Sequence, residues 1–457
     1  MGERQELDTS RSSISTRAIT NLMAGQSLSP GESRSAIFSA MANDPTMNSR
    51  PDTPLEDIPT ALNSERQSFD LDPEKRGDSC RIDIYDPNRP KLGFRQRIHH
   101  FTWAWFTWPM STGGLSLLIY AQPYQFPGLP QIGFAVYITT LVLFTIVVTC
   151  MVTRFCLYRE DLRNSVTHSR EGLFLPTSFL ALATIITGTQ RYIVPENIAP
   201  VRWLILGAFW TYLLVSLVLA VGQYSHLFSK HRYELDTMMP TWILPIFPIM
   251  LSGTIASVIA ATQPDMAAIP IIVAGLGAQG LGISVAVMMY AHMIGRLMRA
   301  ELPDREHRPG LFMNVGPPAF TALAFIGMAN GLPNSFDREL DGMIDVNIIR
   351  TFALISAIFL WGLALWWFFI AAVAVLSSRP KYFHLGWWAM VFPNTGFILA
   401  TISIAKEFKN AHVLRFASVL SILLVLMYLF VLVSHIRAVI RQDIMYPGRD
   451  EDVEERI

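Results

Sequence analysis

The stretch at 387–407 reads WWAMVFPNTGFILATISIAKE, and its length and apolar content are those of a membrane-spanning helix. Near its middle, however, the run FPNTG at 392–396 places a proline beside small and polar residues. A proline in a helix interior removes a backbone donor and clashes with the preceding turn, at a cost of about 3 kcal/mol. The meaning of this break depends on whether it recurs along the chain.

The composition is that of an all-α polytopic membrane protein. Of the 457 residues, 51% are hydrophobic and only 16% are charged, which is too apolar for an ordinary soluble enzyme of this size. Apolar runs of about 20 residues, the length that crosses roughly 30 Å of hydrocarbon, recur along the chain. The ten transmembrane helices that they predict lie at about 101–121, 131–153, 172–192, 203–226, 240–262, 268–297, 312–330, 347–376, 385–405 and 412–436.

The two ends of the chain differ from this apolar middle. Residues 1–90 are rich in Ser, Asp, Glu, Arg and Pro and hold no long apolar run, which is typical of a disordered tail. Residues 91–440 form the expected transmembrane domain, and 441–457 a short C-terminal tail. One set of loops carries twelve Lys and Arg residues against five in the other set. The positive-inside rule therefore places the first set, and both termini, in the cytosol.

The net charge, the cysteines and the motifs of the chain argue against several classes of function. The formal net charge is zero, so no nucleic-acid partner is indicated. The three cysteines, Cys80, Cys150 and Cys156, form neither a disulfide framework nor a metal-ligand cluster. Neither an HExxH nor a GxSxG motif occurs. We therefore expect no enzyme, no metal site and no cofactor.

The proline at 393 belongs to a repeat. Every odd-numbered span has a proline at similar depth, followed by small or polar residues, whereas the even spans lack this pattern. These prolines are Pro109, Pro176, Pro248, Pro318 and Pro393, separated by 67 to 75 residues. A fixed period of about 70 residues indicates a repeated helical hairpin, with one broken helix and one continuous apolar helix.

Five hairpins that all begin at the cytosolic side are parallel repeats, which can close into a quasi-five-fold ring around an axis normal to the membrane. Irregular backbone at membrane depth is tolerated where it is buried or lines a cavity. The pattern therefore predicts that the odd helices surround a central pore and that the even helices face lipid. The alternative is that the prolines only curve the helices for packing.

The ionisable residues suggest that an anion passes through this pore. No Asp or Glu lies in the interior of an expected span, whereas basic residues stand at the ends of odd helices: His100 at the inner end of the first, Arg191 and Lys406 at outer ends. Candidate hydroxyl and amide donors along the lining are Ser111, Thr112, Thr177, Ser252, Asn394 and Thr395. Two alternatives stay open, because Arg191 could snorkel to the interface and hydroxyls often bond to their own helix. An uncharged solute then remains possible.

Six segments, in order and through nearly every span, resemble the fungal malic acid transport proteins of the tellurite-resistance/dicarboxylate transporter family, which is related to the plant slow anion channels. They are HFTWAWFTWPMSTGG (100–114), TWILPIFPIMLSG (241–253), RPGLFMNVGPPAF (308–320), FLWGLALW (359–366), WWAMVFPNTGF (387–397) and YPGRDED (446–452). The resemblance covers about residues 91–452. Pro109 departs from the family pattern. The third span matches more weakly, which leaves Arg191 supported by charge alone.

The resemblance implies ten helices in five hairpins around a central pore. It also implies transport of malate and similar C4-dicarboxylates such as succinate and fumarate across the plasma membrane. Phe392, the aromatic residue directly before the proline of the ninth span, would be the ring that occludes the pore. Related proteins are trimers with one pore per subunit, so a homotrimer in the lipid bilayer is expected.

Two other functions stay open. One is an inorganic-anion channel or sulfite exporter on the same fold. The other is a receptor or scaffold that has kept the fold and conducts nothing, for which the long N-terminal tail would supply a regulatory role. Coupling is open as well. With no carboxylate inside a span, a proton would have to travel on a monoanionic substrate or through a histidine such as His100.

Overall fold

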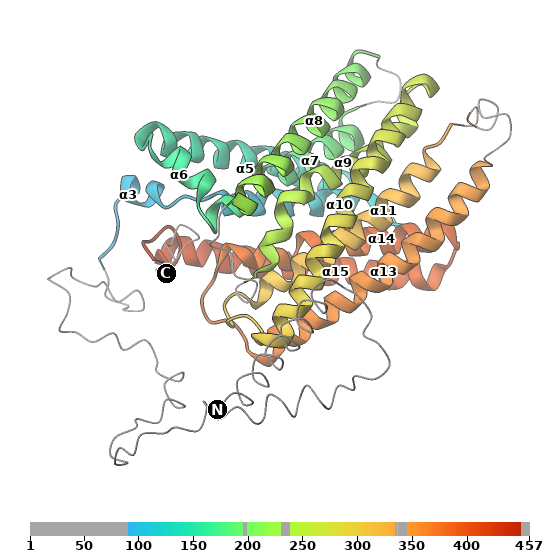
Figure 1. Ribbon diagram of the computed structural model, residues 1–457. Helices are drawn as coiled ribbons and strands as arrows, with labels where there is room; N and C mark the ends of the chain where they lie inside the picture. Colours follow the sequence, from blue (N-terminus) through green and yellow to red (C-terminus); the bar gives the residue numbers. More distant parts are fainter. Residues whose placement is uncertain (1–89, 195–198, 230–237, 334–335, 337–344, 449–457) are drawn as a thin grey trace, which may run out of the picture. The chain divides into compact units, whose positions relative to one another are not determined.

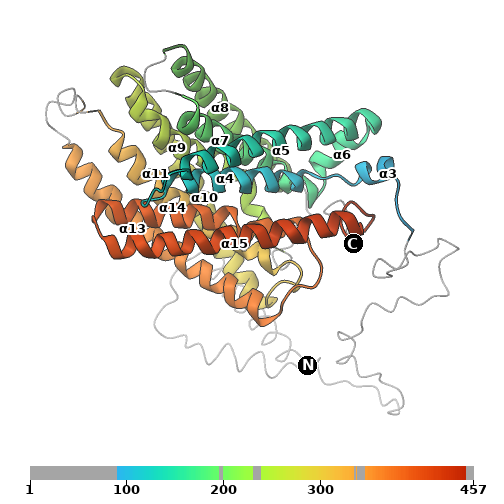
Figure 2. The ribbon, with the colours of Figure 1, turned by 180° about the vertical axis from the view of Figure 1, so that it is seen from behind.

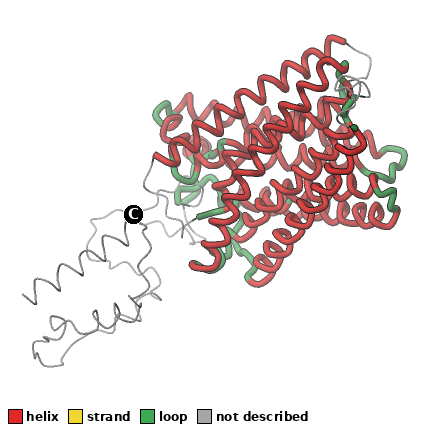
Figure 3. Tube along the Cα trace, turned by 45° about the vertical axis from the view of Figure 1, so that its right-hand side comes forward, coloured by secondary structure: helices red, strands yellow, loops and turns green. Residues whose placement is uncertain are grey.

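The computed structural model describes residues 90–194, 199–229, 238–333, 336 and 345–448. Within these ranges every regular element is a helix (Figure 1, Figure 3). The expected N-terminal tail lies outside the described residues apart from Pro90, and so does the expected C-terminal tail beyond residue 448.

The prolines of the odd spans stand in the first turn of an α-helix that follows a 3₁₀ segment. The span that contains Pro393 consists of η10 (Leu385–Met390) and α14 (Phe392–Glu407), with the proline at the second helical position. The same order recurs in η4 (Trp103–Phe106) with α4 (Thr107–Ala121), η5 (Glu171–Phe174) with α7 (Pro176–Tyr192), η7 (Pro240–Ile246) with α9 (Phe247–Ile259), and η9 (Arg308–Val315) with α11 (Gly316–Asn330). An N–H in the first turn has no intrahelical partner, so the proline loses no hydrogen bond there. At each of these positions the chain therefore changes from a 3₁₀ helix to an α-helix, and the proline does not interrupt the α-helix itself.

The even spans are long α-helices without such a change. They are α5 (Leu129–Leu157), α8 (Ala199–Ser229), α10 (Asp265–Arg299), α13 (Val346–Ser377) and α15 (Ala411–Arg441). The even helices are not free of proline, because α10 contains Pro270 in its second turn. Shorter helices are α3 (Phe94–His99) and α6 (Asp161–Thr167) before α7, and η8 (Ala260–Thr262) after α9.

Nine helices in the described part are long and apolar enough to cross a membrane, against the ten expected spans. They include every even helix and the four odd spans from η5 with α7 onward. The segment at the first expected span, η4 with α4, does not meet the criterion, because tryptophan, glycine, serine and threonine make up much of it.

Burial separates the two kinds of helix. In the four odd spans that meet the criterion, between 67% and 94% of the most apolar window is buried inside the protein, whereas the even helices reach only 22% to 39%. Helix α4 packs on α7, α7 on α9, α9 on α11, α11 on α14, and α14 again on α4. Each even helix packs on the odd helix before it, α13 on α11 and α15 on α14 among them (Figure 1, Figure 2). The odd helices therefore supply most of the core.

A buried ionic cluster holds the start of α4. Arg154 of α5 is 4% exposed; it forms an ion pair with Glu171, which is 2% exposed, and donates to the carbonyl of Phe101 at 2.8 Å. Glu171 also accepts a hydrogen bond of 2.7 Å from Ser165, whose oxygen accepts one of 2.8 Å from the Trp103 indole. The sequence pattern placed acids only outside the spans. Glu171 stands at the first position of its helix and is nevertheless buried, because Arg154 compensates its charge.

The two ends of the transmembrane unit are joined by hydrogen bonds. The side-chain amide of Gln442 accepts from the backbone N–H of Leu92 at 2.9 Å and donates to the carbonyl of Leu92 at 3.2 Å. Arg97 donates to the carbonyl of Val439 at 2.9 Å. The first residues of the expected C-terminal tail are therefore packed against the beginning of the transmembrane unit.

Candidate functional site

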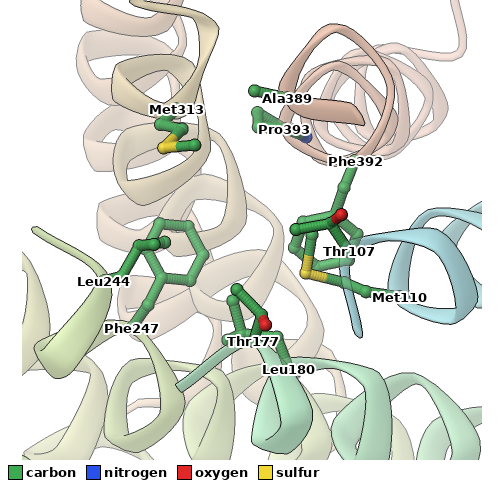
Figure 4. Close-up of a pocket in the computed structure, with 10 residues that line it drawn as sticks. All are labelled: Thr107, Met110, Thr177, Leu180, Leu244, Phe247, Met313, Ala389, Phe392 and Pro393. Atoms are coloured by element: carbon green, nitrogen blue, oxygen red, sulfur yellow. The ribbon is translucent and has the colours of Figure 1, made fainter. Parts of the chain in front are cut away.

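A small cavity lies where the first turns of the proline-containing helices meet. Its volume is about 20 Å³, which is room for roughly one water molecule and far too little for a dicarboxylate. Figure 4 shows side chains from several helices pointing toward this space. The lining residues are Thr107 and Met110 of α4, Thr177 and Leu180 of α7, Leu244 of η7, Phe247 of α9, Met313 of η9, Ala389 of η10, and Phe392 and Pro393 of α14. We call this space the central cavity.

Phe392 lines one side of the central cavity. Its side chain is 2% exposed, and its ring stacks on that of Phe320 of α11 with centroids 5.0 Å apart and an interplanar angle of 28°. The ring of Phe320 in turn meets the ring of Phe247 edge to face, at 6.2 Å and 83°. On the other side of Phe392 lies Gly114 of α4, where an added Cβ would come within 3.1 Å of the phenylalanine ring. The ring is therefore held from two sides.

Three of the expected donors stand close to this ring and use their hydrogens locally. Thr177 lines the central cavity, but its hydroxyl lies 2.7 Å from the carbonyl of Phe174 and 3.0 Å from that of Trp103. The Thr395 hydroxyl donates to the carbonyl one turn earlier, at 3.1 Å. The Asn394 amide nitrogen does the same at 2.8 Å, and its buried oxygen has no partner. Of these three residues only Thr177 lines the central cavity, and the hydroxyls of Thr177 and Thr395 are each directed at backbone carbonyls.

The other three expected donors do not line the central cavity. Ser111 is fully buried, with its hydroxyl 3.5 Å from the carbonyl of Trp388. Thr112 contacts α15, because its hydroxyl lies 3.0 Å from that of Tyr428, and it also donates to its own helix at 2.9 Å. Ser252 of α9 is fully buried and its hydroxyl has no partner.

The three expected basic residues lie at the two opposite ends of the span formed by η4 and α4. Arg191 and Lys406 are both exposed and meet at the last residues of α4. The Arg191 guanidinium carbon lies 5.4 Å from the Tyr120 ring centroid, and the Lys406 ammonium lies 3.5 Å from the carbonyl of Ala121. Both cations therefore stand at the same end of α4.

His100 lies shortly before Trp103, the first residue of η4. It is therefore at the opposite end of this span from Arg191 and Lys406. It is half-buried, with its ring 5.1 Å from that of His99. His99 in turn lies 3.1 Å from the Asp161 carboxylate. The structure thus brings Phe392 and Thr177 to the central cavity, places Arg191 with Lys406 at one end of α4, and leaves His100 at the other.

Sequence reasoning did not identify Phe247 or Phe320. A signal existed for Phe247, since it precedes Pro248 just as Phe392 precedes Pro393, at the same place in the repeat. No such local signal marks Phe320, which reaches Phe392 through the packing of α11 on α14.

The sequence of this chain is similar to those of known membrane transport proteins. Residues 100–436 match the family model described as SLAC1, voltage-dependent anion channel. The chain is 35% identical over 367 residues to the malic acid transport protein of Schizosaccharomyces pombe, covering 79% of this chain and 84% of that protein. A sulfite efflux pump of Trichophyton rubrum is 28% identical over 319 residues, covering 68% of this chain and 84% of the pump.

The matched region begins at His100, contains η4 with α4 and every other helix that lines the central cavity, and extends into α15. The family resemblance expected from the six sequence segments is thereby confirmed. The chain belongs to the SLAC1 family of voltage-dependent anion channels.

Proposed function

We propose that this protein carries C4-dicarboxylates such as malate, succinate and fumarate across the plasma membrane. The anion path would run between α4, α7, α9, α11 and α14, with η4 and α4 as a tenth span and five parallel hairpins in a quasi-five-fold ring. Two features support this path: the closed order of contacts among these helices, and the high burial of the odd spans. Both termini would then be cytosolic, and three subunits would each have one path.

The observation that carries the proposal is the central cavity closed by Phe392. A space of about 20 Å³ beneath a stacked ring is what a closed gate in an anion path requires. Swinging the ring aside would open the space, and the hydroxyls of Thr177 and Thr395 could then turn toward a passing carboxylate. Ser111, Thr112, Ser252 and Asn394 are proposed to join the lining in the open state. The choice of malate rests on the similarity to the yeast malic acid transport protein.

The test is labelled malate flux into proteoliposomes, measured with and without an inward proton gradient at fixed voltage. We expect malate to enter, and chloride to compete weakly. Flux that follows the proton gradient would indicate coupling through a monoanionic substrate or through His100, and His100→Gln would separate these two. Flux that follows only voltage and the malate gradient would indicate a channel.

A second candidate is sulfite export on the same fold, favoured by the 28% identity to the sulfite efflux pump. The same vesicles decide between the two. Sulfite flux in the absence of malate flux would overturn the dicarboxylate assignment and leave the anion path in place. Absence of flux for every anion in folded protein would instead favour a receptor or scaffold.

Arg191→Ala should weaken the apparent affinity for malate. Arg191 and Lys406 together raise the local anion concentration at one end of α4, so loss of one charge should raise KM about two- to fivefold at low ionic strength. The maximal rate should stay within about twofold of the native value. Arg191 lies in the last turn of α7, whereas Phe392 lies at the level of the first turn of α7. The measurement is malate uptake against concentration at two salt levels.

The matched control is Arg415→Ala, an exposed arginine in the second turn of α15. Its removal should leave KM unchanged. An unchanged KM in Arg191→Ala, or an equal rise in both variants, would make Arg191 an interface residue without a role in anion capture.

A further inference from the structure

Two aromatic rings beside Phe392 are each seated on a glycine of the next helix. The ring of Phe320 of α11 covers Gly396 of α14, where an added Cβ would lie only 2.7 to 2.9 Å from three ring carbons. The ring of Phe247 of α9 covers Gly316 of α11 in the same way. Such distances are too short for any side chain, so both rings depend on the absence of a Cβ beneath them.

The seat at Gly396 lies next to the proposed gate. Gly396 follows Phe392 by one helical turn, so both positions are on the same face of α14. The ring of Phe320 therefore fills the groove of α14 beside Phe392 and stacks on it at 5.0 Å. While Phe320 keeps this position, the Phe392 ring cannot tilt toward α11.

The position of Phe320 is itself fixed. The residue is 5% exposed, and the Phe247 ring approaches it edge to face at 83°. Gly316 and Phe320 are one turn apart on α11, so the rings of Phe247 and Phe320 lie next to each other along the same face of α11. The three rings thus connect α9, α11 and α14 at the level of the central cavity.

We propose that Phe320 is a positioning residue that locks Phe392 in the closed position, with Gly396 as its seat. This inference rests on the proposed gate at Phe392. Phe320 does not line the central cavity, so it acts on the anion through Phe392. Opening the gate then requires Phe320 to leave Gly396, which couples a movement of α11 to the movement of the Phe392 ring.

The experiment is malate flux in proteoliposomes for Phe320→Ala, Phe392→Ala and the double variant. Phe320→Ala should raise flux about two- to tenfold, the population shift that one aromatic pair supports. In the Phe392→Ala background the same change should add nothing, because the ring that Phe320 holds is already gone. Phe320→Leu, which keeps most of the bulk over Gly396, should stay near the native flux.

Gly396→Ala supplies an independent measurement. The added methyl group should push Phe320 out of the groove and raise flux while Phe392 is still present. In the Phe320→Ala background it should have no effect, because the space above residue 396 is then empty. The matched controls are Gly277→Ala of α10 and Gly362→Ala of α13, where an added Cβ meets no atom within 4 Å. Both should keep the native flux.

The outcomes separate the two proposals. If Phe392→Ala raises flux but Phe320→Ala does not, the gate stands and the role of Phe320 is overturned. If the two alanine effects multiply in the double variant, Phe320 is an independent obstruction, which also overturns its positioning role. If Phe392→Ala leaves flux unchanged in folded protein, both the gate and its lock are wrong. Should Gly396→Ala fail to fold, the Phe320 and Phe392 cycle decides alone.

Discussion

Phe392→Ala should raise malate flux at least about tenfold. The variant removes a ring that is 2% exposed, stacked on Phe320 and packed against Gly114. Burial of a phenylalanine and one aromatic pair together stabilise the closed state by about 2 to 4.5 kcal/mol, and each 1.4 kcal/mol is a factor of ten in population. The measurement is initial malate uptake per mole of protein that elutes as a single folded peak.

Phe397→Ala is the matched control on the same helix. Phe397 is buried to a similar degree, but its ring stacks on Trp361 at 5.5 Å and on Phe368 at 5.9 Å, away from the central cavity. Its removal costs the same volume and should leave flux near the native value. An equal rise in both variants would indicate general loosening of the core and would contradict a gate at Phe392.

The period of the prolines was enough to predict which helices are buried. Pro393 and its counterparts recur every 67 to 75 residues, and the four of their spans that meet the length and hydropathy criterion have the higher burial. The pattern could not show whether each proline kinks one continuous α-helix or stands in the first turn of an α-helix that begins there. Pro393 is compatible with a kink or with a first turn, and the choice depends on the 3₁₀ turn of η10, which has no distinct sequence signature.

The sequence singled out candidate residues by two routes. Phe392 was singled out by the family resemblance, and Thr177 by its place after Pro176. The partner ring Phe320 is 72 residues away in sequence, and its contact depends on how α11 packs on α14. The burial of Glu171 was missed for the same reason, since it depends on an ion pair with Arg154, which belongs to a different helix, α5.

Glu171→Gln should lower the stability of the folded protein by about 3 kcal/mol. Glutamine keeps the shape of the side chain but removes the buried carboxylate beside Arg154, which is 4% exposed, and leaves it with the Asp161 carboxylate at 3.6 Å, which is 20% exposed. The effect should reach the central cavity, because Glu171 holds Trp103 through Ser165, and the Trp103 carbonyl accepts a hydrogen bond of 3.0 Å from Thr177. We expect the thermal midpoint in detergent to fall by about 5 °C.

Two further variants identify the cause of this loss. Glu160→Gln removes an exposed acid near the same end of α5 and should leave the midpoint unchanged, because exposed charges contribute little. Arg154→Met combined with Glu171→Met removes both charges of the buried pair and should recover at least half of the loss, since the remaining carboxylate, Asp161, is 20% exposed and keeps His99 at 3.1 Å. A double variant that is less stable than Glu171→Gln would show that the hydrogen bond from Arg154 to Phe101, and not the ion pair, holds the start of α4.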